Sequence, residues 1–265
     1  MQYKEEAQPH TRMMKCTLEI EPSRSYWHLC ASAGGSVSKE KAFEESVFGS
    51  KTFLRVERLI ADMRHRYDAY PFALEVLGKW RPMELSDRAL ICHWHTQLAD
   101  PIYRKFTGDY LVERYYGPAG NVDNDMTSRW IELTVPDRWQ IPTRNKIASK
   151  MLTSALSAGI IASNRNPRPI HFPRVSDLAL CYLMYLLREI QYEGTAISNP
   201  YLTSVGLDQD EAVRRIRGIR ELGFSKQGDL LQFDWQHDSM MEWARSAGIL
   251  SEVDNETNNV QRAAT

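Results

Sequence analysis

A run of positive charge between residues 138 and 174 constrains this 265-residue sequence more than any other feature. The run contains no Asp or Glu, and its cationic side chains are Arg138, Arg144, Lys146, Lys150, Arg165, Arg168 and Arg174. Because the whole chain has a formal net charge of −1 and the run carries +7, the remaining residues together carry −8. Charge segregated in this way is typical of a surface that binds a polyanion. A solvated basic face on an ordinary helix and loop is the alternative.

Composition favours a globular intracellular protein. Apolar residues make up 43% and charged residues 25% of the sequence, which is the balance of a folded chain. Since the net charge is close to zero, any nucleic-acid binding must be local. The four cysteines form no C-x-x-C pair, which indicates a reducing compartment. There is no signal-peptide pattern, and the longest apolar run, residues 178–187, is about half of what a bilayer requires. We therefore expect a cytoplasmic protein without a membrane contact.

The first half of the sequence predicts helices and no strand. No stretch before residue 117 shows sustained alternation of apolar and polar side chains, whereas apolar residues recur at helical spacing. Helices are predicted at residues 37–48, 51–67, 72–80, 86–99 and 101–116. They form an N-terminal helical bundle at residues 26–118, which ends at a Gly-Pro-Ala-Gly break. Both ends of the chain are polar, so residues 1–25 predict a loosely ordered arm and residues 251–265 a disordered tail.

The second half opens with a pattern typical of a winged helix-turn-helix at residues 119–174. A helix at residues 126–133 leads into a proline-rich connector. A second helix follows at residues 143–158, with Thr143 as its N-cap and a glycine directly after it. Residues 160–172 then read as a hairpin with two arginines at its tip. In such modules the second helix enters the major groove of DNA while the wing touches the backbone.

The same layout of helix, connector, helix and hairpin occurs again at residues 175–250. It begins with an apolar helix at residues 176–192, and a second helix at residues 208–222 starts with a capping-box-like D-x-x-E. A hairpin is predicted at residues 224–235, and a short helix closes the module. The fold class expected for the whole chain is therefore mainly α, with an N-terminal helical bundle followed by two winged-helix-like modules with short β-hairpins.

The two candidate recognition helices differ in charge at the end that approaches DNA. The first begins with cationic residues, and the helix dipole adds positive potential there. The second begins with Asp208, Asp210 and Glu211, which repel phosphate. We therefore expect the first module to bind duplex DNA through Arg138, Arg144, Asn145, Lys146, Ser149, Lys150, Arg165, Arg168 and Arg174. Secondary candidates for backbone contacts, which pairing with nearby acids explains equally well, are Arg214, Arg215, Arg217 and Lys226.

Most of these side chains suit phosphates, and only Arg144, Asn145 and Ser149 have the geometry to contact base edges. Five phosphate contacts predict a log–log dependence of affinity on salt with a slope of about −4.5.

No catalytic signature accompanies the basic run. Sequences of the G-x-S-x-G, H-E-x-x-H and Walker types are absent. Cys92, His93 and His95 invite a metal interpretation, but His93 and His95 are two residues apart on a predicted helix and point in different directions, so structural histidines are favoured. A metal-dependent nuclease needs several acids near the basic run, and the run itself has none, although Asp123, Asp125 and Asp137 are near in sequence. We expect no enzymatic activity, no cofactor and no metal.

Several runs resemble the BrxA family of the BREX phage-defence systems, over residues 26–247. They are LSDRALICHWHTQLADPIYRKFTGDYLVERYY, SRWIELTVP, TRNKIASKMLTSALSAGII and GFSKQGDLLQFDWQHDSMMEWA. The resemblance implies a compact, mainly helical protein with a basic groove that binds DNA and no enzymatic activity of its own. It also implies that the protein is encoded together with other BREX proteins, namely a methyltransferase and large ATPases. We expect a monomer.

Two alternatives stay open at this point. One is a protein–protein adaptor of the defence system that uses aromatic residues of the first half, namely Trp80, Trp94, Tyr115 and Tyr116. The other is a winged-helix transcriptional repressor, which predicts a dimer and a palindromic footprint.

Overall fold

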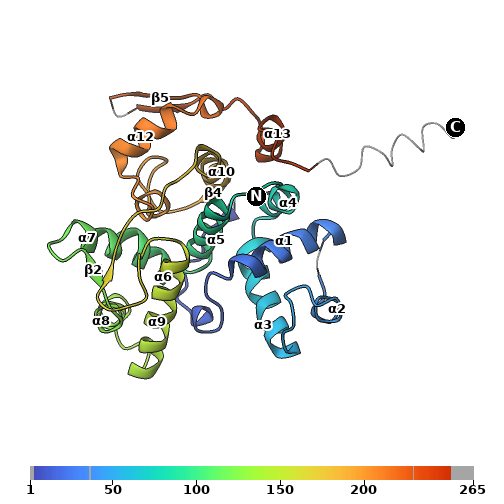
Figure 1. The fold of residues 1–265 in the computed structure, drawn as a ribbon. Helices are drawn as coiled ribbons and strands as arrows, with labels where there is room; N and C mark the ends of the chain where they lie inside the picture. The colour runs from blue at the N-terminus through green and yellow to red at the C-terminus, as the bar shows by residue number, and fades with distance from the viewer. Residues whose placement is uncertain (1–2, 36, 229, 252–265) are drawn as a thin grey trace.

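The computed structural model describes residues 3–35, 37–228 and 230–251, which form a mainly helical protein with a few short strands (Figure 1). The predicted mainly α class is thereby confirmed. In the first half the elements are β1 (Tyr3–Lys4), the 3-10 turn η1 (Arg12–Met14), α1 (Ile20–Ala33), α2 (Lys39–Glu44), α3 (Phe53–Met63), the π turn η2 (Arg64–Asp68), α4 (Pro71–Lys79), α5 (Leu85–Ala99), α6 (Pro101–Lys105), the π turn η3 (Phe106–Tyr110) and α7 (Leu111–Tyr116). In the second half they are β2 (Asn121–Val122), α8 (Asn124–Thr134), α9 (Ile141–Ser157), β3 (Arg168–Pro169), α10 (Asp177–Arg188), β4 (Ile190–Gln191), α11 (Pro200–Thr203), α12 (Gln209–Arg217), the 3-10 turn η4 (Arg220–Leu222), β5 (Phe224–Gln227), β6 (Leu230–Phe233) and α13 (Met240–Ser246).

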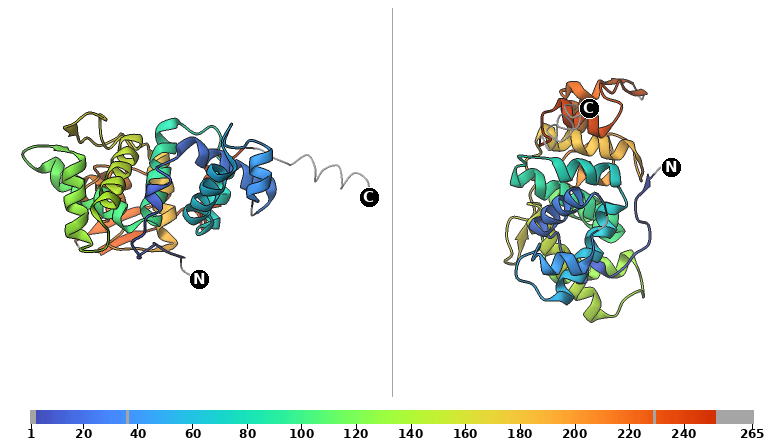
Figure 2. Two further views of the ribbon diagram at one scale, coloured as in Figure 1. Left: turned by 90° about the horizontal axis from the view of Figure 1, so that it is seen from below. Right: turned by 90° about the vertical axis from the view of Figure 1, so that its right-hand side faces the viewer.

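Helix α5 lies at the centre of the fold. Helices α1, α6, α9 and α10 all pack against it (Figures 1 and 2). Trp94 of α5 is fully buried, and its indole N–H donates to the Tyr201 carbonyl oxygen at 3.1 Å. One cluster of buried apolar side chains extends from Met13 to Ile249. The boundary predicted after residue 118 therefore does not separate two hydrophobic cores.

The N-terminal segment packs into the fold, so the expected loose arm is wrong for residues 3–25. Strand β1 pairs in parallel with β4, with Tyr3 opposite Ile190. Met13 and Leu18 are buried, and α1 begins inside the predicted arm. Seen from below, this segment runs between the α8–α9 pair and the group formed by α1, α2 and α3 (Figure 2). It therefore joins parts of the chain that are far apart in sequence.

The helix starts show which capping predictions hold. The Asp208 carboxylate accepts the Glu211 backbone N–H at 2.9 Å, so the predicted start of α12 is confirmed. The prediction of Thr143 as the N-cap of α9 is wrong. That helix begins two residues earlier and carries Pro142 in its first turn, where a missing N–H leaves no intrahelical bond unmade.

The two predicted hairpins have different outcomes. Strands β5 and β6 form the expected hairpin, with Phe224 opposite Phe233, although Asp229 at its turn lies outside the described residues. Residues 160–172 form instead a loop, the 160–172 loop, closed by one antiparallel bridge between Ile161 and Ile170. Strand β3 within this loop pairs with β2, which precedes α8. The loop is therefore tied to the segment between α7 and α8.

The end of α10 also departs from the prediction. This helix stops at Arg188, before the expected end at residue 192, because Ile190 and Gln191 pair with β1. Among the described residues, no helix has the length and apolarity to cross a bilayer. The predicted disordered tail lies outside the described residues from 252 onward.

Candidate nucleic-acid interface

Helix α9 carries the first part of the basic run, and α8 packs along one side of it. Arg144 faces α8, where its guanidinium pairs with Glu132 and donates to the Trp139 carbonyl oxygen at 3.0 Å. Asn145 also faces α8, since its side-chain oxygen accepts a hydrogen bond from the Ser128 hydroxyl at 2.6 Å. Both side chains therefore already have partners on α8, and the predicted contacts with base edges would require them to leave these partners.

Lys146 and Lys150 lie on another side of α9. The Ser154 hydroxyl contacts the Met13 sulfur at 3.5 Å, which identifies the side of α9 that meets η1. At 100° per residue, Lys150 and Lys146 fall within about 80° of Ser154 around the helix. Lys146 is exposed and Lys150 is half-buried, so both flank the contact with η1 on its solvent side. Ser149 is exposed and lies farther around the helix.

Cations of η1 and α3 continue this basic surface. Arg12, Lys15 and Arg58 are exposed and line a common pocket of about 100 Å³. Sequence reasoning missed all three, because two lie in the segment expected to be loose and Arg58 lies on the polar side of an ordinary helix. They lie close to the basic run because η1 packs against α9 and the residues that follow η1 hydrogen-bond to α3.

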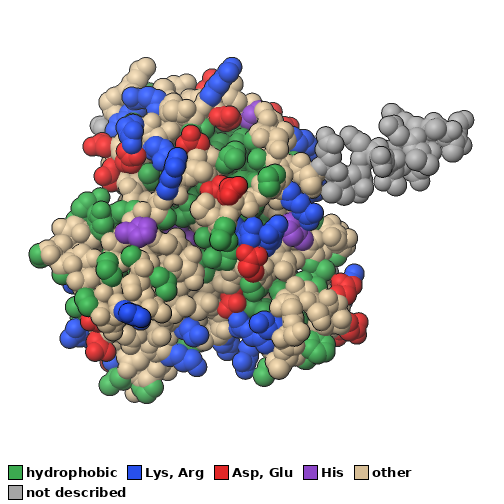
Figure 3. Space-filling model, in the orientation of Figure 1, with side chains coloured by type: hydrophobic (Ala, Val, Ile, Leu, Met, Phe, Trp, Pro, Cys, Tyr) green, Lys and Arg blue, Asp and Glu red, His purple; other side chains and the backbone are tan. Residues whose placement is uncertain are grey.

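We call the surface formed by Arg12, Lys15, Arg58, Lys146 and Lys150 the α9–α3 groove. Figure 3 shows Lys and Arg side chains gathered over α9 and α3, on both sides of a notch in the lower part of this face. In the part of the chain that the structure describes, none of these five side chains makes an ion pair. Asp62 lines the same pocket as Arg12, Lys15 and Arg58 but pairs with Arg66, so the five cations keep a net positive charge.

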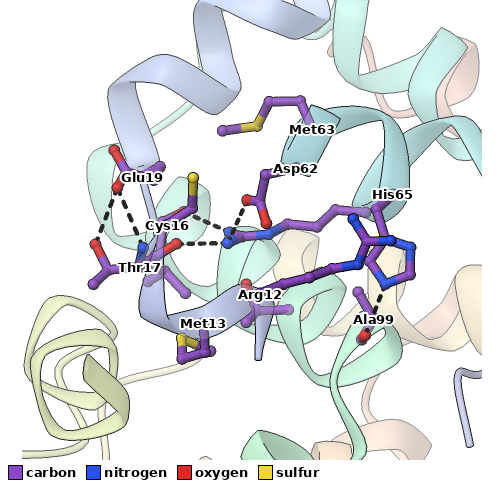
Figure 4. A network of polar contacts seen from close by, with 12 residues as sticks. Arg12, Met13, Cys16, Thr17, Glu19, Asp62, Met63, His65 and Ala99 are labelled. Atoms are coloured by element: carbon purple, nitrogen blue, oxygen red, sulfur yellow. Dashed lines mark hydrogen bonds and ion pairs between the residues drawn. The ribbon is translucent and has the colours of Figure 1, made fainter. Parts of the chain in front are cut away.

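A buried network fixes the floor of the groove (Figure 4). The Arg66 guanidinium pairs with Asp62 at 2.6 Å and donates to the Thr17 and Leu18 carbonyl oxygens at 2.6 and 3.0 Å. Arg55 adds a second tie, donating to the Lys15 carbonyl oxygen at 2.8 Å. These contacts hold the segment after η1 against α3 and the π turn that follows it. Burial raises the pKa of Asp62 to about 6, although Arg66 opposes the shift.

A histidine pair borders the same floor. The ring nitrogens of His10 and His65 lie 2.8 and 3.1 Å from the Ala99 carbonyl oxygen, and the ring centroids are 5.3 Å apart. Arg12 lies beside His65 (Figure 4). Burial first, and then the charge of Arg12, lower the pKa of His65. Near neutral pH this histidine is therefore uncharged and leaves the positive charge to the arginines and lysines.

Arg138 anchors the connector between α8 and α9 to the N-terminal segment. Its guanidinium donates to the Pro9 carbonyl oxygen at 2.6 Å and lies 5.7 Å from the centre of the Trp139 ring. The side chain is exposed, so it contributes positive charge near the start of α9 while holding the connector in place.

The remaining cations of the run lie beyond the C-terminal end of α9. Arg165 is exposed in the 160–172 loop, and the guanidinium of Arg168 donates to the Asn166 side chain at 3.1 Å. Arg174 is exposed and lines a cleft of about 940 Å³ together with Asp87 and Asp177. Since α9 is about 25 Å long at 1.5 Å per residue, the run does not form one continuous patch, and Arg165, Arg168 and Arg174 do not belong to the α9–α3 groove.

Two of the four secondary candidate cations in the C-terminal part of the chain are paired. Arg214 makes a two-pronged contact with Glu211 at 2.5 and 2.8 Å. Arg215 pairs with Asp177 at 2.8 Å and also donates to a backbone carbonyl. Arg217 is exposed and Lys226 is half-buried. Pairing with acids thus explains Arg214, whose partner is Glu211, and Arg215, whose partner is Asp177.

His93 and His95 are fully buried and hydrogen-bonded at both ring nitrogens. Within residues 3–35, 37–228 and 230–251, no three His, Cys, Asp or Glu side chains gather closely enough to hold a metal ion. The partners of both histidines are protein groups, in agreement with the structural interpretation of these residues.

Comparisons with known proteins bear on the fold alone. No family model and no curated protein matches this sequence. Among solved structures, the chain is similar to an uncharacterized protein from Magnetospirillum magneticum, known from its crystal structure. The TM-score is 0.55 at 15% sequence identity, and the match covers 69% of this chain and 98% of that chain. The two chains therefore share a fold, and a fold alone does not assign a function.

Proposed function

We propose that this protein binds duplex DNA through the α9–α3 groove and has no catalytic role of its own. The supporting observation is that η1 packs against α9, which brings Lys146 and Lys150 to the side of the pocket lined by Arg12, Lys15 and Arg58, and that among the described residues none of these five cations makes an ion pair. Mixed charges are the rule on protein surfaces, so an uncompensated cluster of this kind favours a polyanionic partner. Its resemblance to the BrxA family makes a BREX-type defence system, with a methyltransferase and ATPases, the proposed setting.

The contacts in the groove favour the DNA backbone over the bases. Arginine and lysine side chains on separate elements bind phosphates as point charges, and such contacts carry no sequence information. Arg144 and Asn145 are engaged by α8, so Ser149 alone is left from the three side chains predicted to contact bases. We therefore propose binding that tolerates many sequences and weakens steeply with salt.

The helix-turn-helix part of the predicted winged-helix module forms part of this proposal, while the arginines of the 160–172 loop lie outside the α9–α3 groove. The α8–α9 pair followed by the 160–172 loop supports a helix-turn-helix in which α9 is the recognition helix. Its N-terminal half, which bears Lys146, is the part that approaches DNA in this geometry. The repressor alternative makes a distinct prediction, namely a dimer with a palindromic footprint.

The adaptor alternative loses part of its support. Trp80 and Trp94, which it needs on the surface, are buried at 2% and 0% exposure. Only Tyr115 and Tyr116 are exposed among the four aromatic residues that it uses.

Replacing Lys146 and Lys150 together with glutamate is expected to weaken duplex binding roughly 10- to 100-fold near 0.1 M salt, because two phosphate contacts become repulsive. The log–log salt slope is expected to fall from about −4.5 for five contacts to about −2.7. Fluorescence anisotropy with a labelled 20-base-pair duplex over a salt series measures both quantities.

The matched control carries Lys4→Glu and Lys105→Glu, which change the net charge by the same amount at exposed sites on β1 and at the end of α6. This control is expected to bind within about twofold of the wild type. Equal losses in both double variants would mean that net charge alone governs binding, and an unchanged Lys146→Glu/Lys150→Glu variant would overturn the groove assignment.

A further inference from the structure

The exposed rings of Tyr115 and Tyr116 and the half-buried ring of Phe172 form an aromatic ladder at the end of α7, in which neighbouring rings meet edge to face or at a tilt. Tyr116 is 66% exposed and Tyr115 is 39% exposed, and their ring centroids lie 5.2 Å apart. The Tyr115 ring also lies 4.5 Å from the ring of Phe172, which belongs to the 160–172 loop. Tyr116 is more exposed than the other open aromatic side chains, since Phe43 and Phe53 are 40% and 39% exposed. A partner that uses ring faces explains their exposure.

Backbone contacts between β2 and β3 hold this ladder near the arginines of the 160–172 loop. Strand β2 follows α7 after a short turn and pairs with β3, which places Val122 opposite Arg168. The Arg114 guanidinium donates twice to the Asn121 carbonyl oxygen, at 2.9 and 2.8 Å, and so fixes the end of α7 against β2. Arg168 and Phe172 are four residues apart in one chain segment, so their backbones are at most about 14 Å apart.

Phe172 is supported from behind by Gly206. A Cβ atom added at Gly206 would lie 2.4 Å from the Phe172 ring, so only glycine permits this approach. The backbone of Gly206 also has a φ of +80°, which L side chains rarely adopt. The aromatic ring is therefore held firmly, and the ladder has one rigid end.

From this juxtaposition we propose that Tyr115, Tyr116 and Phe172, together with Arg165 and Arg168, bind single-stranded nucleic acid. Unpaired bases stack on the aromatic rings, and the two arginines contact the phosphates between them. Proteins that bind single strands without sequence preference combine these two features, because every base has a π-face and every nucleotide a phosphate. A duplex does not offer its base faces, so this surface selects a separated strand.

The ladder is separate from the α9–α3 groove. The 160–172 loop begins where α9 ends, whereas Lys146 lies near the start of that helix, about 20 Å away along its axis. A protein with both surfaces holds a duplex at one end of α9 and an unpaired strand at the other. The inference does not rest on duplex binding, since each surface has its own residues.

The test compares the affinity for a labelled 12-nucleotide single strand with that for the 20-base-pair duplex. Tyr116→Ala is expected to weaken single-strand binding about 5- to 100-fold, the range for loss of one stacked base, and to leave duplex binding within about twofold. Tyr116→Trp is expected to retain single-strand binding, because stacking needs the ring and not the hydroxyl. Leu230→Ala, which truncates a side chain that is 65% exposed on β6, is the control and is expected to change neither affinity.

Three results would overturn the proposal. One is a wild-type protein that shows no saturable binding of the single strand at low salt. Another is equal single-strand affinity for the wild type and Tyr116→Ala. The last is an equal loss of single-strand and duplex binding in Tyr116→Ala, which would mean one shared site. Repeating the titration with RNA of the same sequence identifies which strand is preferred. The Lys146→Glu/Lys150→Glu variant is expected to keep single-strand binding, so failure of either proposal is recognised independently of the other.

Discussion

Replacing Arg66 with alanine is expected to lower the free energy of unfolding by about 3–5 kcal/mol, the usual cost of removing one partner of a buried ion pair. The side chains of Arg66 and Asp62 are only 3% and 8% exposed, and they lie 2.6 Å apart. The variant leaves Asp62 without its cation and leaves two carbonyl oxygens of residues 17 and 18 without their donor. Urea denaturation at pH 7.5, followed by tryptophan fluorescence, measures the loss.

The loss is also expected to depend on pH. The pKa of Asp62 is already raised to about 6 with Arg66 present, and removal of the cation raises it further. A carboxyl group whose folded pKa exceeds its unfolded value stabilises the folded chain less as pH rises through that pKa. The deficit of Arg66→Ala relative to the wild type is therefore larger at pH 8 than at pH 5.

Arg58→Ala is the control for this substitution, because it removes an exposed arginine from the same part of the chain. It is expected to change stability by no more than about 0.5 kcal/mol. The double variant Asp62→Leu/Arg66→Met tests the cause, since an apolar pair is expected to recover much of the stability lost by Arg66→Ala. A loss below 1 kcal/mol in Arg66→Ala would show that the Arg66–Asp62 ion pair does not stabilise the floor of the groove.

Local sequence patterns predicted helices well and the faces of helix α9 poorly. Alternation of apolar and polar residues identified β5 and β6, and Asp208 marked the start of α12, because both signals act over a few residues. A helical repeat distinguishes buried from exposed sides, so it places Arg144 on the side of α9 that faces solvent. The repeat does not reveal that α8 brings Glu132 beside this arginine. A polar side chain facing a polar partner looks the same in sequence as one facing water.

The groove itself depends on contacts between distant segments. Arg12, Arg58 and Lys146 come from three elements, and nothing in the local sequence of any of them points to the other two. The strand pair formed by Tyr3 and Ile190 illustrates the same limit, since two-residue strands have no detectable alternation. The charge run was informative because it marked one wall of the groove, but its arginines beyond residue 160 belong to a different surface.

Lowering the pH from 7.5 to 5.0 is expected to reduce the free energy of unfolding, and the largest contribution comes from two histidines that are buried in their neutral form. His93 lies between the hydroxyls of Tyr103 and Ser204, at 3.0 and 2.9 Å. The Ser204 hydroxyl donates to the Tyr201 carbonyl oxygen, so it accepts from the Nε2–H of His93, and the tautomer follows from this network. The ring therefore has no hydrogen-bonding need that a second proton would meet.

His95 is satisfied in the same way with the opposite tautomer. Its Nδ1–H donates to the Arg66 carbonyl oxygen at 3.2 Å, and its Nε2 accepts from the Tyr182 hydroxyl at 2.7 Å. Burial lowers the pKa of His93 to about 3 and that of His95 to about 4, from a usual value near 6.5. The pKa of each histidine is lower in the folded chain than in the unfolded chain. The neutral rings therefore stabilise the folded chain fully above pH 6.5, and this stabilisation is lost as the pH falls toward the folded pKa values.

The size of the effect follows from proton binding, because both histidines bind protons at pH 5 in the unfolded chain and not in the folded chain. At pH 5 each histidine costs about 2 kcal/mol, from 1.36 kcal/mol per pH unit below 6.5. Asp62 opposes this by about 1 kcal/mol, because its raised pKa favours the folded chain on acidification.

His93→Gln is expected to shrink the difference in the free energy of unfolding between pH 7.5 and 5.0 by about 2 kcal/mol, whatever its stability at pH 7.5. His171→Gln, at an exposed site, is the matched control and is expected to leave that difference unchanged. An unaltered difference in His93→Gln would show that this ring is not the source of the acid sensitivity.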